Sequence, residues 1–302
     1  MPIPPEPKRE HPSTYFVQDR SNQEEMKRLQ IQDAMATAGM GGPLAEQPDP
    51  TAFQRVLDVG CGTGGWLIEL AKTTPTSTEL VGVDASRTFV EYARAQAEAE
   101  QVSDRVKFQV MDSLRMLEFP NHSFDLVNLR LGMSWLRTWD WPKVLQEFGR
   151  IARPDGVIRI TEANAFPDGN SPALMRIGDL GMTAFYQAGH LFTQTRDGMT
   201  SQLARLLEQH GYQQVQTQAH VLEYRAGTPE GLNFTANLQL VFRTIVPFLQ
   251  KWARLPDDYE ELYHQMLQEI QQPDFVARQY LLTAWGMVSP PELSTRKSDP
   301  LR

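Results

Sequence analysis

The sequence predicts an α/β protein whose doubly wound, mostly parallel sheet is covered by helices on both faces. Short apolar runs rich in valine, leucine and isoleucine alternate with segments of helical spacing, and polar residues close several of these runs. A third observation is the glycine-rich stretch VLDVGCGTGGW, residues 56–66, which contains the end of the first run. Ligands of such sheets bind where the parallel strands end, so the polar residues at the run ends are the first candidates for a site.

The expected strands are the runs RVLDV (55–59), LVGVD (80–84), VKFQV (106–110), FDLVNL (124–129) and VIRITE (157–162). The segments of helical spacing between them are 64–74, 86–100 and 141–152. The last of these has a favourable start, because Asp140 suits a helix cap and Pro142 suits the first turn. Arg159 stands in a strand that is otherwise fit for burial, and the sequence offers no explanation for it.

The glycine-rich stretch predicts a tight turn that holds a small cofactor. Gly60, Gly62 and Gly64 let the backbone pass close beneath a ligand, and the helix that follows offers free N–H groups. Gly60, Gly62 and Gly65 also satisfy the GxGxxG fingerprint of dinucleotide sites. Asp84 suits either interpretation, because a carboxylate at the end of the next strand binds the ribose of any adenosine cofactor. The glycines alone therefore leave two cofactors open.

Residues outside the turn distinguish the two. Asp58 precedes the first glycine by two residues, where its carboxylate would repel a pyrophosphate but suits the ammonium of an amino acid. The motifs LDVGCGTG, VGVD, MDS, FDLV and GRIARPDG follow one another over roughly residues 53–164. In this set and order the chain resembles the class I S-adenosylmethionine-dependent methyltransferases. That resemblance disfavours a nicotinamide-dependent oxidoreductase.

The resemblance implies a Rossmann-like, seven-stranded sheet with an antiparallel last strand, and a function in methyl transfer that releases S-adenosylhomocysteine. Asp58 and the turn around Cys61 would hold the methionine part of the cofactor, Asp84 the ribose, and Asp112 the adenine. Asn128 and Arg130 would line the methyl-donor end, and Tyr15 of an N-terminal lid would cover the cofactor. The full set of cofactor-binding residues expected is Asp58, Gly60, Cys61, Gly62, Asp84, Ala85, Asp112, Ser113, Asn128, Arg130 and Tyr15. Arg20, Glu25 and Arg28 are further candidates for lid contacts, or they are charges on a solvent-facing helix.

Two long additions rich in Leu, Met, Phe and Tyr interrupt the end of the family's pattern. The first (165–199) precedes a helix and strand expected within 200–226, and the second (227–273) lies between these and the last strand. We expect the two additions to form a helical cap over an apolar acceptor pocket, although extra core or a homodimer surface would give the same pattern. Candidate pocket walls are Trp135, Tyr186, His190 and Phe192. The expected organisation is a disordered tail (1–12), a helical lid (13–50), the cofactor-binding core (51–164), a first cap insertion (165–199), core continuation (200–226), a second cap insertion (227–273), the last core strand (274–290) and a tail (291–302).

Composition limits the partners and the compartment. A net charge of −8 disfavours nucleic-acid binding, and no apolar run reaches the roughly 20 residues of a membrane span. One cysteine excludes an intrachain disulfide and a CxxC metal knuckle, so no metal is expected. The segment MPIPPEPKREHP does not resemble a signal peptide. We expect a cytoplasmic enzyme that acts on a small-molecule acceptor.

The catalytic residues are less well indicated than the cofactor site. A general base is needed only when the acceptor arrives protonated, and His190, Glu162 or His220 could supply one. The chain has NLRL where nucleobase and amide-nitrogen methyltransferases carry an NPPY-like tetrapeptide, which disfavours those substrates. The acceptor atom stays open between O, N and C. A protein that binds the cofactor on the same scaffold without methylating is the alternative.

Overall fold

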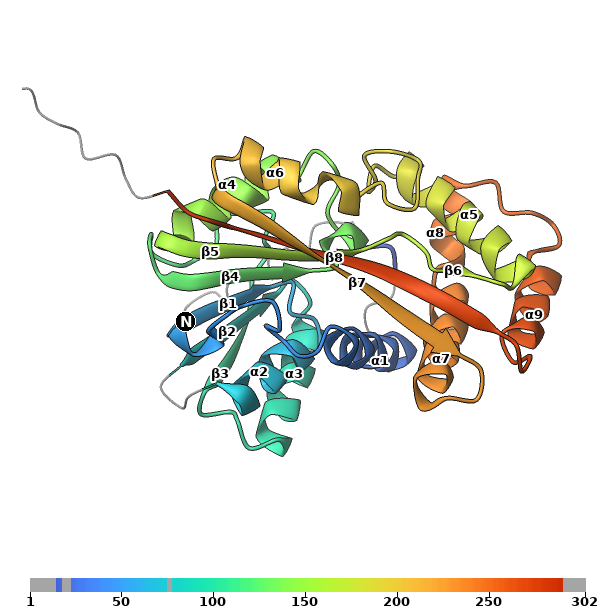
Figure 1. The fold of residues 1–302 in the computed structure, drawn as a ribbon, viewed down its shortest axis with the longest axis horizontal. Helices are drawn as coiled ribbons and strands as arrows, with labels where there is room; N and C mark the ends of the chain where they lie inside the picture. Colours follow the sequence, from blue (N-terminus) through green and yellow to red (C-terminus); the bar gives the residue numbers. More distant parts are fainter. Residues whose placement is uncertain (1–14, 18–22, 75–77, 290–302) are drawn as a thin grey trace, which may run out of the picture.

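The computed structural model describes residues 15–17, 23–74 and 78–289, and its centre is one mixed sheet (Figure 1). Five parallel strands come first: β1 (Arg55–Val59), β2 (Glu79–Asp84), β3 (Val106–Val110), β4 (Phe124–Arg130) and β5 (Ala152–Ala163). β8 (Val276–Met287) pairs antiparallel with β5, with β7 (Gln213–Arg225) and with the two-residue β6 (Asp168–Gly169). The strand order β3-β2-β1-β4-β5-β8 confirms the predicted doubly wound sheet, and β6 raises the seven expected strands to eight. The expected tails and Arg20 lie outside the described residues.

Helices cover both faces of the parallel half of the sheet. α2 (Gly65–Thr73) and α3 (Arg87–Ala99) pack with Val56, Leu80 and Leu126 in one apolar cluster. α4 (Trp141–Ile151) and α6 (Leu203–Gln209) pack against the opposite face in a second cluster. Strand residues alternate between the two clusters because successive side chains in a strand point to opposite faces. Asp58, Asn128 and Arg159 therefore all lie on the face that α2 covers.

The remaining helices gather around the far end of the long β7–β8 pair (Figure 1). They are α5 (Pro172–Gln187), α7 (Pro229–Thr244), α8 (Val246–Trp252) and α9 (Tyr259–Glu269), with α1 (Gln23–Gly39) lying beside α7. Aromatic rings join these helices, and the centroid of Phe185 lies 5.0 Å from that of Phe248 and 5.5 Å from that of Phe16. Phe166 and Phe242 stack at 6.2 Å in the same cluster. Burial of a large aromatic side chain is worth about 1.5–3 kcal/mol, so these rings contribute substantially to holding the cap helices together.

In the part of the chain that the structure describes, no helix combines the length and apolarity that a membrane crossing requires.

Candidate cofactor and acceptor site

The turn between β1 and α2 requires glycine for two different reasons. Gly60 and Gly64 have φ of 72° and 80°, in the left-handed region where a side chain is strained. A Cβ on Gly64 would also lie 2.6 Å from Cζ of Phe108. At Gly60 the backbone N–H donates to the carbonyl of Val83 over 2.8 Å, which ties the turn to the end of β2. The turn is thus fixed in shape before any ligand binds.

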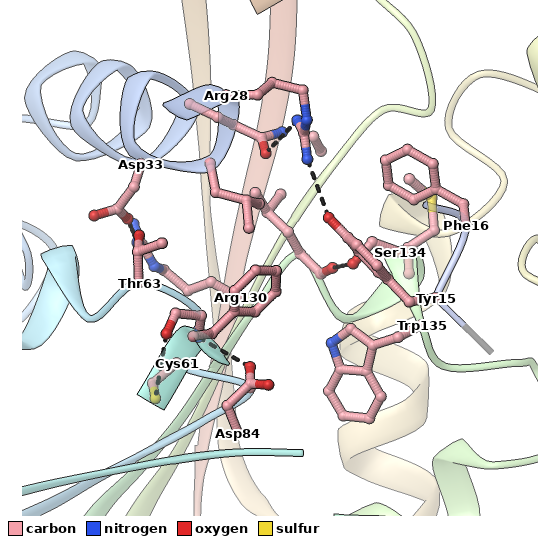
Figure 2. A pocket seen from close by; sticks show the side chains of 18 of the residues that line it. Tyr15, Phe16, Arg28, Asp33, Cys61, Thr63, Asp84, Arg130, Ser134 and Trp135 are labelled. Atoms are coloured by element: carbon pink, nitrogen blue, oxygen red, sulfur yellow. Dashed lines mark hydrogen bonds and ion pairs between the residues drawn. The ribbon is translucent and has the colours of Figure 1, made fainter. Parts of the chain in front are cut away.

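Asp84 is the polar end of β2 and is joined to the same turn. Its Oδ2 accepts a 3.0 Å hydrogen bond from the backbone N–H of Gly62, and its Oδ1 accepts one of 2.8 Å from Ser86. These bonds hold the carboxylate at the mouth of the turn, facing the cavity described next. Figure 2 shows it directly beside Cys61.

One cavity of about 1030 Å³ runs from this turn to the helical cap. Its first half is lined by polar residues at the strand ends, among them Asp58, Cys61, Asp84, Asp112 and Ser113. Its second half is lined mainly by apolar side chains of the lid, the cap and β7–β8: Phe16, Met35, Phe166, Phe185, Leu222, Phe234, Leu238, Val241, Phe242, Ile245 and Leu281. Such a shape accommodates a polar nucleoside and an apolar partner end to end. We call the second half the acceptor chamber.

Asp58 is supported from below by a row of buried polar groups. The amide of Asn128 donates to Oδ1 of Asp58 over 2.7 Å, and Arg159 donates to Oδ1 of Asn128 over 2.8 Å. Arg159 forms an ion pair of 2.6 Å with Glu46, and its side chain has no exposure to solvent. Burial raises the pKa of Asp58 to about 7, although Asn128 and Arg159 act in the opposite direction. Arg159, which the sequence left unexplained, is thus the cation of this row.

The N-terminal lid closes the cavity through two polar connections (Figure 2). Arg28 donates to the Glu25 carboxylate over 2.7 and 2.8 Å and to the Tyr15 hydroxyl over 3.1 Å, and Tyr15 in turn donates to Glu25. Burial raises the pKa of Tyr15 well above its ordinary value, so the phenol stays neutral. In the second connection, Arg130 at the end of β4 forms an ion pair with Asp33 of α1. The first set of contacts ties α1 to the segment around Tyr15, and the second ties the middle of α1 to the end of β4.

Replacing Arg28 with methionine is expected to loosen the lid. Glu25 is fully buried, and removing one partner of a buried ion pair costs about 3–5 kcal/mol because the other charge is left uncompensated. Hydrogen exchange of the backbone amides in residues 23–39 should become faster, while the central strands keep their protection. Arg243→Met is the matched control, since Arg243 pairs with the neighbouring Glu24 at the surface, where a pair is worth about 1 kcal/mol at most. Equal protection of α1 in both variants would contradict the role given to Arg28.

Three of the four expected pocket walls do not line the cavity. His190 is fully buried between Phe185 and Phe248, its Nδ1 lies 2.9 Å from the Leu136 carbonyl oxygen, and it does not line the cavity. Burial lowers its pKa to about 4, so His190 is corrected from a candidate base and pocket wall to a core residue. Tyr186 and Phe192 also lie outside the cavity lining, whereas Trp135 is part of it. The helical spacing of these residues predicted that they belong to the cap, but it could not predict which of them face the cavity.

Glu162 and Asn128 need a similar correction. Glu162 is fully buried and accepts a 3.0 Å hydrogen bond from the backbone N–H of Met133, and burial raises its pKa to about 8. It supports the loop after β4 and does not line the cavity, so it is no base for the acceptor. Asn128 lies behind Asp58 instead of beside the methyl donor. His220 borders a separate small hollow with Asn164 and Thr200.

Sequence reasoning missed Glu46 and Asp33, which complete the site from the N-terminal segment. Both fall within the segment expected to form the lid (13–50): Glu46 lies between α1 and β1, and Asp33 lies on α1. The cationic Arg159 in a buried strand indicates that a buried carboxylate must pair with it, but it does not indicate where in the chain that carboxylate lies.

A cavity that joins glycine amides and strand-end carboxylates at the edge of a parallel sheet defines a class: Rossmann-like proteins that bind a nucleoside cofactor. Comparison with known proteins narrows it. Residues 56–156 match the methyltransferase domain family. The chain is 30% identical over 176 residues to demethylmenaquinone methyltransferase of Lactiplantibacillus plantarum, covering 54% of this chain and 72% of that protein. It belongs to the class I S-adenosylmethionine-dependent methyltransferase family.

Two further comparisons agree with this membership. Methyltransferase GfsG of Streptomyces halstedii is 34% identical over 132 residues, which cover 43% of this chain and 46% of that protein. The chain thus spans about half the length of several of the curated relatives it matches. Phosphoethanolamine N-methyltransferase 2 of Haemonchus contortus shares the fold, with a TM-score of 0.52 at 20% identity over 91% of this chain and 60% of that one.

S-adenosylmethionine is the cofactor of this family, and the chemistry of the cavity fits it. Carboxylates of Asp58 and Asp84 face the cavity from neighbouring strands, where one suits an ammonium and the other a pair of ribose hydroxyls. A Cβ on Gly62 would meet nothing within 4 Å, so this part of the turn borders open space.

Proposed function

We propose that the protein transfers the methyl group of S-adenosylmethionine to a small acceptor with a large apolar part. The observation that carries this proposal is the single cavity that joins the glycine turn to the acceptor chamber. Asp58, Asp84 and Asp112 would bind the cofactor, and the apolar walls would bind the acceptor. Burying the apolar part of an acceptor stabilises it by about 25 cal/mol per Å².

The chamber supports an acceptor that brings its own nucleophile. S-adenosylmethionine supplies an electrophilic methyl group, which a nucleophile must approach in line. Among the described residues that line the chamber half, we find no Asp, Glu or His that is directed at the acceptor. The two nearby carboxylates are paired with cations: Asp33 with Arg130, and Glu25 with Arg28. The walls therefore act by positioning the acceptor and excluding water. Arg28 lines this part of the cavity, and its guanidinium can donate a hydrogen bond to an acceptor oxygen.

Relatives suggest the first acceptor to test. Several of them are named demethylmenaquinone methyltransferase or ubiquinone/menaquinone biosynthesis C-methyltransferase. A reduced quinone fits the proposal because its ring oxygens make the adjacent ring carbon nucleophilic and its remainder is apolar. The proposed reaction is then C-methylation of a quinol ring: the ring carbon bonds to the methyl carbon as the S–CH3 bond breaks, S-adenosylhomocysteine is released, and the replaced ring hydrogen leaves as a proton to solvent.

The test is release of S-adenosylhomocysteine from S-adenosylmethionine in the presence of a reduced, short-chain demethylmenaquinone. Turnover that depends on both compounds supports the proposal. No turnover with this quinol or with other apolar phenols, despite tight cofactor binding, would favour a cofactor-binding protein without methyl transfer.

A bulkier side chain in the acceptor chamber should weaken acceptor binding without weakening cofactor binding. Leu238 of α7 lines the chamber and is buried, so Leu238→Trp should raise the KM for the acceptor at least about tenfold through overpacking of about 1–3 kcal/mol. Affinity for S-adenosylhomocysteine, measured by calorimetry, should stay within about twofold. Leu232→Trp, on an exposed position of the same helix, should change neither quantity. An unchanged KM in the Leu238 variant would place the acceptor elsewhere.

A further inference from the structure

The row Glu46–Arg159–Asn128–Asp58 crosses three neighbouring strands at matching positions. Asp58 in β1 pairs in register with Asn128 in β4, and Asn128 pairs with Arg159 in β5. Their side chains therefore project from the same face of the sheet, one beside the next. Only Asp58 of the four lines the cavity. The other three have no direct contact with the cavity.

Each member of the row fixes the next by a directed hydrogen bond. Arg159 Nη1 donates to Oδ1 of Asn128, which requires the Asn128 amide nitrogen to face Asp58, where it donates over 2.7 Å. The guanidinium cannot turn away, because Glu46 accepts from its Nε at 2.6 Å and from its Nη2 at 3.1 Å. The Trp66 ring lies 5.9 Å from the guanidinium carbon. The indole of Trp66 is itself held by the carbonyl of Pro43 at 2.9 Å.

The net charge of the row is negative when its members are ionised, which favours a cationic group of a ligand. Asp58 and Glu46 are each −1 and Arg159 is +1, so the ionised row carries one net negative charge beside the cavity. An unpaired carboxylate as deeply buried as Asp58 takes up a proton, since burial disfavours the charged form. Arg159 counteracts this across Asn128, and Glu46 is held ionised by Arg159, with its pKa below the ordinary value although burial acts to raise it.

We propose that Arg159 is a positioning residue, which through Asn128 holds the Asp58 carboxylate in the orientation that binds the amino group of the cofactor's methionine part. The inference rests on the proposed placement of that amino group at Asp58. Arg159 has no contact with the cavity, yet it would affect the binding of one end of the cofactor. The ribose and adenine, bound by Asp84 and Asp112, should not depend on Arg159.

The experiment compares two ligands that share the nucleoside but differ at the amino-acid end. S-adenosylhomocysteine has the ammonium, whereas 5′-methylthioadenosine lacks the entire amino-acid part. We expect Arg159→Met to weaken binding of S-adenosylhomocysteine by about tenfold or more, the size of one lost charge-assisted contact. Binding of 5′-methylthioadenosine should stay within about twofold. Arg153→Met is the matched control, because Arg153 lies in the same strand, is partly exposed and pairs with Asp125, away from the cavity.

A second variant separates positioning from stability. Arg159→Met leaves Glu46 buried without its partner and should lower the melting temperature, whereas Glu46→Gln/Arg159→Met removes both charges and should recover much of that loss. The double variant should keep the selective loss of S-adenosylhomocysteine binding. If it recovers full affinity, or if both ligands weaken together in either variant, Arg159 is only a structural residue and the proposal is overturned. If the native protein binds 5′-methylthioadenosine as tightly as S-adenosylhomocysteine, Asp58 does not bind the amino group and the proposal also fails. Native protein that binds neither ligand would contradict the proposed function itself.

Discussion

Asp84→Ala is expected to reduce affinity for S-adenosylmethionine and S-adenosylhomocysteine by about a hundredfold or more. A hydrogen bond to a charged group contributes about 1.5–3 kcal/mol, and a carboxylate at this position accepts from two ribose hydroxyls. The substitution also removes the acceptor for the backbone N–H groups of Gly62 and Ser86, so the turn loses part of its support. Titration calorimetry with S-adenosylhomocysteine measures the loss directly.

The control for Asp84 is another aspartate with the same chemistry. Asp125 at the start of β4 accepts from the backbone N–H groups of Gln54 and Arg55 at 3.0 and 2.8 Å but does not line the cavity. Asp125→Ala should lower stability and leave affinity unchanged. In contrast to the Arg159 variants, Asp84→Ala should also weaken 5′-methylthioadenosine, because that ligand retains the ribose. Equal affinities of the Asp84 and Asp125 variants would show that the ribose binds elsewhere.

Asp58→Asn should stabilise the ligand-free protein at pH 8 while weakening the cofactor. The folded-state pKa of Asp58 is raised from 3.8 to about 7, so the folded chain holds a proton that the unfolded chain releases between these values. Stability from this group is complete below pH 4 and is lost as the pH rises through 7. One pKa unit corresponds to about 1.4 kcal/mol, so up to about 4 kcal/mol is lost by pH 8. Asparagine has no such cost and still accepts from Asn128.

Thermal unfolding between pH 5 and pH 8 tests the stability part of this prediction. The native protein should lose stability relative to Asp58→Asn as the pH rises, and the two curves should approach each other toward pH 5. Affinity of the native protein for S-adenosylmethionine should rise from pH 6 to pH 8 as Asp58 ionises, whereas that of the variant should be low throughout. Parallel stability curves would mean that Asp58 is not desolvated in solution.

Strand ends were predictable from the sequence because a parallel sheet places them at one edge. The runs ending in Asp84 and near Asp112 are each followed by a helix or loop, so their carboxyl ends had to meet there, and both residues line the cavity. Asn128 satisfied the same rule, yet it lies behind Asp58. A strand that is apolar on both faces gives no indication of whether a polar residue in it points toward the cavity or into the protein. This orientation decides whether the residue contacts a ligand or supports another residue that does.

The cap was harder to predict for a related reason. Helical spacing identified the apolar segments, but His190 and Tyr186 show that an amphipathic helix can turn a candidate residue into the core or toward solvent. His190 is buried against Phe185 and Phe248, while Tyr186 of the neighbouring turn is 38% exposed. Contacts between α5 and α8, which are far apart in the chain, decide this orientation.

The sequence by itself determined the order of strands and helices, the glycine turn and the carboxylates at the strand ends, because all three depend on local periodicity and on backbone conformations that neighbours in the chain dictate. Only the tertiary structure decided how the N-terminal segment closes the site and why Arg159 is buried. Glu46 and Arg159 are 113 residues apart and meet only when the connection before β1 folds back over the sheet. Pairing of buried charges depends on distance in space, and a sequence without its fold does not contain that distance.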